Sequence, residues 1–313
     1  MRIAILGATS QIAKDLVQSF AANSMHDLVL FARRPEAVTQ WLADVGLVGR
    51  YAVANFAAFS ADQHFDAILN FVGVGNPAQA IAMGASIFDV TLQYDELALS
   101  YVRQHPECRY IFLSSGAAYG SRFDSPADEN TKAVISINNL QPQDWYGVAK
   151  LHAECRHRSL PHLPIVDIRV FNYFSHTQDT LARFLITDVV RAIISGKTLI
   201  TSSEDITRDY IGPFDFYQLI SIVLAGPSRN DVLDCYTKAP VNKLTLLDSI
   251  SEHFIFTYQI EDAPAGVNAT GVKNNYYSTF LKAGTLGYEP EKTSLDNILD
   301  EVKLITKLVY FIK

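Results

Sequence analysis

Short apolar runs alternate with segments of helical spacing along the first half of the chain. Residues 3–6 form an apolar run that stops at Gly7, and the apolar positions from 11 to 22 recur with the spacing of a helix. A second apolar run, residues 28–31, leads into a helical segment over residues 35–42. Two strands joined by a helix predict a parallel pair, because a parallel connection needs a crossover of this length.

Further apolar runs continue this alternation. They cover residues 51–54, 67–71, 110–113 and 165–171, with intervening stretches that can hold helices. The pattern predicts an α/β fold with a doubly wound parallel sheet of the Rossmann type. Residues 120–144 are polar and contain several Pro, Asp, Glu and Asn, so we expect a long loop over the sheet edge, where loops of this length are often functional.

After residue 174 the alternation weakens and mixed short segments appear. Helical spacing covers residues 181–195, 214–224, 244–253 and 295–312. We therefore expect a first domain over residues 1–174 and a smaller C-terminal α/β lobe over residues 175–313, with the two interleaved in space. The last helix is amphipathic, and few basic residues lie beside it, which favours docking onto the protein itself or a sister subunit over membrane contact.

Composition and charge narrow the class of protein. The chain has 313 residues, of which 49% are hydrophobic, so it can bury a substantial core. A net charge of −7 argues against nucleic acid or an anionic membrane as the main partner. Cys108, Cys155 and Cys235 lack C-x-x-C spacing and are expected to be buried free thiols. With no signal-peptide pattern and no long apolar span, the protein is expected to be cytoplasmic.

Two segments near the N-terminus predict a dinucleotide site. Small residues recur at Gly7, Ser10 and Ala13 where a strand enters a helix, which allows a pyrophosphate to approach the helix N-terminus. The alternative is an ordinary tight turn. The second strand ends with Arg33 and Arg34 and carries no carboxylate for a ribose diol, so we expect NADP, with Arg33 as the leading phosphate ligand. The alternative is a pair of solvated surface arginines.

Tyr146 and Lys150 are four residues apart on a helix expected over residues 144–157, so their side chains share one face. An ammonium beside a phenol lowers the pKa of the phenol and makes it an acid or base near neutral pH. A second pair at this spacing, Tyr288 and Lys292, encloses a proline and is expected in a solvated loop.

Ser115 follows the apolar run at 110–113, so its hydroxyl is expected at the carboxyl end of a strand, where ligands bind in such sheets. There it could donate a hydrogen bond to a carbonyl or an alkoxide. The alternative is a turn rich in serine and glycine.

Together these segments resemble the extended short-chain dehydrogenase/reductase family, which contains nucleotide-sugar epimerases, dehydratases and ketoreductases. The turn at residues 7–13 is similar to its Gly-x-x-Gly-x-x-Gly motif, with Ser10 and Ala13 in place of two glycines. The other motifs resemble the family's in order over nearly the whole chain, at residues 70–73, 111–120, 146–150, 169–172, 196–197 and 208–211.

The resemblance implies roles for the matching residues. Tyr146 would exchange a proton with a sugar hydroxyl or ketone while hydride moves to or from the nicotinamide. Lys150 would lower the pKa of Tyr146 and bind the nicotinamide ribose, and Ser115 would orient the reacting oxygen. The cofactor contacts implied are Gly7, Thr9, Ser10, Gln11, Ile12, Arg33, Arg34, Asn55, Phe71, Val72, Gly73, Lys150 and Phe171. The substrate contacts implied are Ser115, Gly116, Asn172 and Arg208, with a nucleotide diphosphate in the second lobe. No metal is expected.

Two absences narrow the reaction. Family dehydratases carry Asp-Glu after the catalytic hydroxyl residue, and epimerase-reductases carry a cysteine there, whereas this chain has Gly116 and Ala117. Simple reduction of a keto-sugar or 4-epimerisation remains, and Arg33 favours an NADPH-dependent reductase. A non-catalytic NADP(H) sensor is the alternative from another class. The resemblance also implies a homodimer formed through helices near residues 95–104 and 144–157.

Overall fold

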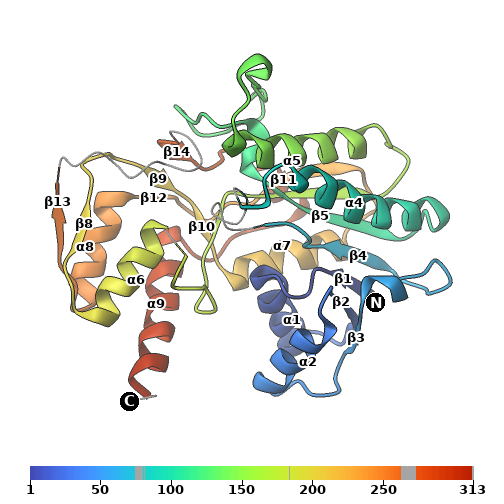
Figure 1. The fold of residues 1–313 in the computed structure, drawn as a ribbon, viewed down its shortest axis with the longest axis horizontal. Coiled ribbons are helices and arrows are strands. Elements are labelled where there is room, and N and C mark those ends of the chain that lie inside the picture. The colour runs from blue at the N-terminus through green and yellow to red at the C-terminus, as the bar shows by residue number, and fades with distance from the viewer. Residues whose placement is uncertain (75–79, 81, 183, 262–272, 312–313) are drawn as a thin grey trace.

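The computed structural model describes residues 1–74, 80, 82–182, 184–261 and 273–311, with side chains described as far as residue 307 (Figure 1). Its centre is a seven-stranded sheet in the order β11-β6-β5-β4-β1-β2-β3, and every neighbouring pair is parallel. The strands are β1 Arg2–Leu6, β2 Asp27–Phe31, β3 Ala52–Ala54, β4 Ala67–Asn70, β5 Arg109–Ser115, β6 Ile165–Val170 and β11 Asp231–Asp234. The expected doubly wound parallel sheet is confirmed.

Helices cover both faces of this sheet, which explains why its strands are continuous apolar runs. One face packs against α1 (Gln11–Asn23), α2 (Pro35–Asp44) and α7 (Pro213–Ala225). The other face packs against α4 (Ser86–Gln104) and α5 (Pro142–Arg158). The strand order reverses between β1 and β4, so the crevice where such sheets bind ligands lies at the carboxyl ends of these strands.

A second lobe lies beside the carboxyl ends of the strands (Figure 1). It contains α6 (Leu185–Ser195), α8 (Lys243–His253) and α9 (Ser294–Phe311), which share an apolar core. Its strands are β7 Asn172–Tyr173, β8 Leu199–Thr201, β9 Thr207–Arg208, β10 Tyr210–Ile211, β12 Val241–Asn242, β13 Tyr258–Ile260 and β14 Asn275–Tyr276. Four 3-10 turns complete the described elements: η1 Phe56–Ala58, η2 Gly116–Tyr119, η3 Ile137–Asn139 and η4 Lys282–Leu286.

The chain crosses between the two parts more than once. β11 and α7 come after residue 174, yet β11 pairs with β6 in the large sheet and α7 packs against α1. β11 is bounded by two aspartates, so hydrophobic spacing gave no sign of it. The described part of α9 buries Ile298, Val302 and Ile305 in the core of the second lobe, so this part of the helix docks onto the protein itself. The side chains of its last apolar turn lie outside the described residues. No helix among the described residues is long and apolar enough to cross a membrane.

Two expectations about exposure were wrong. Tyr288 is 1% exposed and its hydroxyl donates to the Tyr236 carbonyl at 2.9 Å, so it belongs to the core rather than to a solvated loop. The reason is that η4 and the following turn return the chain to the sheet, a tertiary contact that local spacing does not contain. Cys155 is exposed, whereas Cys108 and Cys235 are buried free thiols as expected.

A buried ion cluster joins α4, α5 and β6. The His157 ring is fully buried, and its nitrogens lie 2.6 Å from Asp167 and 2.7 Å from Asp95. Arg156 donates to Asp95 and Arg158 donates to Asp167. Burial lowers the pKa of His157, but the charges and hydrogen bonds of the two aspartates outweigh burial and raise it to about 9.

This raised pKa predicts a loss of stability at alkaline pH. Because the folded pKa of about 9 exceeds the ordinary 6.5, the contribution of His157 is complete below pH 6.5 and is lost as pH rises through 9. The free energy of unfolding, measured with denaturant, should fall between pH 6.5 and pH 9 in the wild type. This fall should be larger than that of His157→Gln by up to about 3 kcal/mol. His152→Gln, on an exposed position of the same helix, is the matched control. Equal pH dependence in wild type and His157→Gln would contradict the assignment.

Candidate active site

The glycine turn between β1 and α1 is shaped to hold a phosphate group. Gly7 has φ +82°, and a Cβ there would lie 2.8 Å from the Val72 backbone nitrogen, so only glycine fits. Ser10 precedes α1 in an extended conformation and its side chain does not cap the helix, which leaves the N-terminal N–H groups available for an anion. Ala13 is fully buried, so this departure from the family glycine fills core space. The residues present therefore fit a dinucleotide pyrophosphate.

The other residues expected around the turn differ in burial and in contacts. Phe71, at 5% exposure, lies on the floor of the turn beside Gly7, and Gly73 follows at the surface. Gln11 donates to Ser175 Oγ at 2.8 Å, which ties the start of α1 to the segment leading into the second lobe. Thr9 is exposed and Ile12 is partly buried.

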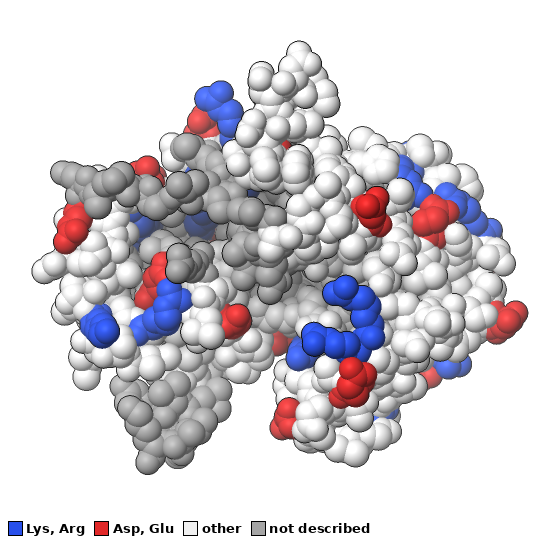
Figure 2. Space-filling model, viewed as in Figure 1, with Lys and Arg blue, Asp and Glu red and all other residues white. Residues whose placement is uncertain are grey.

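Arg33 and Arg34 are both exposed just after β2, and neither forms an ion pair with a residue that the structure describes. Figure 2 shows Lys and Arg side chains gathered near the recess between the two parts of the molecule. Asn55, expected as a cofactor contact, is exposed after β3 and accepts a hydrogen bond from the Ala58 amide at 3.2 Å. These residues therefore lie exposed just after the carboxyl ends of β2 and β3.

Close packing fixes α5 against the end of β5. A Cβ on Gly147 would lie 2.5 Å from the Ala117 carbonyl oxygen, so this helix position must be glycine for the two backbones to approach. The Lys150 ammonium donates to the Leu113 carbonyl at 2.7 Å and lies 4.3 Å from the centroid of the Phe112 ring. A Cβ on Gly73 would lie 3.5 Å from the Lys150 nitrogen. The lysine therefore connects β5, α5 and the segment after β4.

Ser115 and Tyr146 meet at the same point. Ser115 is buried and Tyr146 is half-buried, and a hydrogen bond from Ser115 partly offsets the desolvation that raises the pKa of Tyr146. Burial also lowers the pKa of Lys150 to about 8, and the nearby carboxylates oppose this change. The expected lowering of the Tyr146 pKa by Lys150 is absent, because the ammonium is bonded to the Leu113 carbonyl and lies 5.9 Å from the Tyr146 ring centroid.

Phe171 occupies the space beside Ser115. A Cβ on Gly116 would lie 2.4 Å from the Phe171 ring, so no larger side chain fits at position 116 in this arrangement. Phe171 belongs to an aromatic cluster with Tyr119, Phe123 and Tyr276. The ring thus fills the space that a side chain at position 116 would need.

Tyr276 is a site residue that the sequence gave no reason to choose. Its hydroxyl lies 3.3 Å from Ser115 Oγ, although β14 is 161 residues away along the chain. Asn172, an expected substrate contact, donates to the Asp209 and Tyr276 carbonyls at 3.1 and 3.4 Å and so holds this strand in place. No local motif marks Tyr276, because its position depends on how the second lobe folds back.

A chain of buried charges connects these elements. Glu154 on α5 accepts hydrogen bonds from Ser114 at 2.5 Å and from Arg169 at 2.5 to 3.1 Å. Arg169 also contacts Asp234 at 3.4 Å, and Asp234 accepts from Ser278 at 2.6 Å. These contacts join α5, the central strands and the segment after β14.

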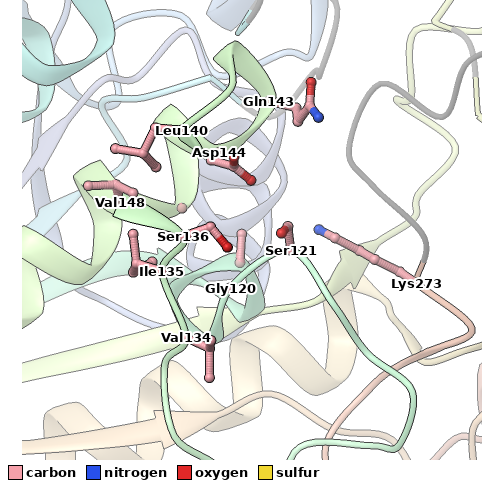
Figure 3. Close-up of a pocket in the computed structure, with 12 residues that line it drawn as sticks. Gly120, Ser121, Val134, Ile135, Ser136, Leu140, Gln143, Asp144, Val148 and Lys273 are labelled. Atoms are coloured by element: carbon pink, nitrogen blue, oxygen red, sulfur yellow. The ribbon is translucent and has the colours of Figure 1, made fainter. Parts of the chain in front are cut away.

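Two cations from the second lobe lie against Tyr276. Lys273 Nζ is 4.2 Å and Arg208 Cζ is 6.0 Å from the ring centroid, and neither forms an ion pair with a described residue. Burial, followed by the charge of Arg208, lowers the pKa of Lys273 to about 8. Lys273 lines a small pocket that is partly open to solvent, and we call this the Lys273 pocket (Figure 3). Its other walls include Ala117, Gly120, Ser121, Gln143 and Gly147.

Several solved structures share this fold at low sequence identity. The UDP-glucuronic acid 4-epimerase from Bacillus cereus, in complex with UDP-glucuronic acid and NAD, has a TM-score of 0.76 at 19% identity, covering 98% of this chain and 100% of that chain. The UDP-glucose 4-epimerase from Thermotoga maritima, with UDP-glucose, has a TM-score of 0.77 at 16% identity, covering 99% and 100%. The UDP-glucose 4-epimerase from Stenotrophomonas maltophila, with NAD and formylated UDP-arabinopyranose, has a TM-score of 0.80 at 16% identity, covering 99% of each chain.

Comparison with curated protein sequences gives no match. A family model does match, over residues 3–236, and it is described as the NAD dependent epimerase/dehydratase family. The matched range runs from the glycine turn through Ser115, Tyr146 and Lys150 to β11. The sequence resemblance to the extended short-chain dehydrogenase/reductases is therefore confirmed, and the chain belongs to the NAD dependent epimerase/dehydratase family.

Proposed function

We propose that the protein is a nucleotide-sugar 4-epimerase that works with a tightly held NAD(P). The observation that carries the proposal is the meeting of Ser115, Tyr146 and Lys150 beside a turn that fits a dinucleotide pyrophosphate. Tyr146 and Lys150 are both present, which argues against a non-catalytic sensor. The family description and the names of the structural neighbours favour epimerisation over the simple reduction that Arg33 suggested.

Each residue has a physical role in this reaction. Tyr146 would remove the proton from a sugar hydroxyl as the carbon is oxidised and return it when the carbon is reduced. Ser115 would orient that oxygen by a hydrogen bond, and the Lys150 charge would favour the phenolate of Tyr146 once its contacts adjust to the bound sugar. Bound NAD(P) supplies the acceptor and donor of hydride. Inversion follows if the keto-sugar presents its other face before reduction.

The space around the reacting carbon argues against elimination of water. Gly116 and Ala117 carry no acid or base, and the Phe171 ring fills the space beside position 116. These two positions therefore offer no group that could protonate a leaving hydroxyl. This leaves proton and hydride transfer at one carbon as the chemistry that the site supports best.

The substrate is proposed to be a UDP-sugar, as in the names of the three neighbours. Arg208 would hold the diphosphate, because its guanidinium has no carboxylate partner among the described residues and lies beside Tyr276. A homodimer through α4 and α5 remains a proposal, as does a boundary between cofactor and substrate lobes near residue 174.

Epimerisation and reduction differ in their use of cofactor. The purified protein should release NAD(P) on denaturation and should interconvert UDP-glucose and UDP-galactose with no cofactor added, because hydride returns to the substrate. Tyr146→Phe should lower kcat by about 10²- to 10⁴-fold while retaining the cofactor, since only the proton acceptor is lost. A requirement for stoichiometric NADPH with a keto-sugar would instead support the reductase.

The choice between NAD and NADP is tested at Arg33. We propose that its guanidinium contacts the 2′-phosphate of NADP, so Arg33→Ala should weaken NADP(H) binding to cofactor-free protein by about tenfold. Binding of NAD(H) should stay within about twofold, because its ribose carries no phosphate there. Arg122→Ala, at an exposed arginine on the loop after η2, is the matched control. Equal affinities for both cofactors, unchanged by Arg33→Ala, would contradict the phosphate assignment.

A further inference from the structure

The Lys273 pocket adjoins the reacting groups. Ala117 is two residues from Ser115, Gly147 is next to Tyr146, and both residues line the pocket. Lys273 Nζ lies 4.2 Å from the centroid of the Tyr276 ring, whose hydroxyl is 3.3 Å from Ser115 Oγ. The pocket therefore adjoins the two segments that carry Ser115 and Tyr146, and its lysine contacts the ring whose hydroxyl lies beside Ser115.

Lys273 and Arg208 lie in different parts of the candidate site. Both lie against Tyr276, but only Lys273 lines the pocket. Arg208 is held by hydrogen bonds to the Thr207 and Asn274 carbonyls. Two neighbouring cations without described ion-pair partners are costly to bury, so each calls for an anion from a ligand. One diphosphate accounts for Arg208 and leaves the lysine to a second negative group nearer the reacting carbon.

The lining of the pocket suits a small planar anion. Figure 3 shows Lys273 extending toward Ser121, with Gln143 and Asp144 at the start of α5 beyond it. The Ser121 hydroxyl and the Gln143 amide are hydrogen-bond donors of the kind that accompany a lysine in carboxylate recognition. Ile135 and Val148 add partly buried apolar side chains to the lining, whereas Val134 is 74% exposed.

Asp144 is the one carboxylate in this lining, and it favours the charged form of Lys273. Its Oδ2 accepts a hydrogen bond from the Gln141 amide at 3.0 Å in the cap of α5. Asp144 and Lys273 form no ion pair in the part of the chain that the structure describes, so the ammonium remains available to a ligand.

We propose that the Lys273 pocket binds the carboxylate of a uronic acid, so that the preferred substrate is a nucleoside-diphosphate uronic acid rather than a neutral nucleotide-sugar. The inference rests on the proposed function and refines its substrate class. Lys273 is then a specificity-determining residue that acts on the sugar, whereas Arg208 acts on the diphosphate common to all such substrates.

The test compares the binding of three ligands to protein that cannot turn them over. In the Tyr146→Phe background with its cofactor bound, titration calorimetry would measure Kd for UDP, UDP-glucose and UDP-glucuronate. UDP-glucuronate should bind about tenfold or more tighter than UDP-glucose, since it adds a charge-assisted hydrogen bond. Adding Lys273→Met should remove this preference while the Kd of UDP and UDP-glucose changes by about twofold or less.

Two further variants separate the roles of the cations. Lys273→Arg should keep the preference for UDP-glucuronate, because the positive charge is retained. Arg208→Gln should raise the Kd of all three ligands by similar factors. Thermal melting of each variant checks that the fold is intact, and Lys273→Gln gives a second charge deletion if the methionine variant melts early.

Each remaining outcome decides against a specific claim. Equal affinity for both sugars in the Tyr146→Phe protein overturns the uronate assignment. Loss of binding of all three ligands with Lys273→Met also overturns it, and indicates that Lys273 contacts the diphosphate instead. Absence of binding for UDP and both sugars refutes the proposed substrate class itself. The failure of the inference and that of the proposed function are thus distinguishable.

Discussion

The clamp that holds α5 against the carboxyl end of β5 is the constraint on which the site depends. Gly147 allows the helix backbone to approach Ala117, and Lys150 anchors to the Leu113 carbonyl. One turn later, Glu154 accepts a hydrogen bond from Ser114. These three contacts fix the start of the helix relative to the end of the strand. Tyr146 and Ser115 therefore meet as a consequence of backbone packing rather than of their own bond.

Buried charge extends this clamp to the second lobe. Arg169 bridges Glu154 and Asp234, and Asp234 accepts a hydrogen bond from Ser278 just after β14. A buried ion pair rarely stabilises a fold more than apolar packing would, but removal of one partner leaves an uncompensated charge and is strongly destabilising. The arrangement thus supports a single relation between α5 and Tyr276, at the place where we propose that the sugar binds.

Much of the sheet domain could be predicted from local patterns. The six strands expected before residue 174 and the helices between them form, because buried parallel strands are continuous apolar runs of a recognisable length. The prediction missed β11, because aspartates at both ends leave this strand without a continuous apolar run. It also failed where a contact between residues distant in the sequence decided the burial of a side chain. Tyr288 is such a case, since Pro290 lies in a segment without a helix, as expected, yet the Tyr288 ring is buried.

The sequence by itself determined three parts of the candidate site: the glycine turn, Ser115 and the Tyr146–Lys150 pair. Each of them follows from a strand end or from helical spacing. Only the tertiary structure decided what surrounds them. Tyr276 and Lys273 reach the site because the second lobe returns to the large sheet. The pKa of Tyr146 is raised because burial outweighs the opposing hydrogen bond from Ser115. Burial and long-range contact are properties of the whole fold, so no local pattern could supply them.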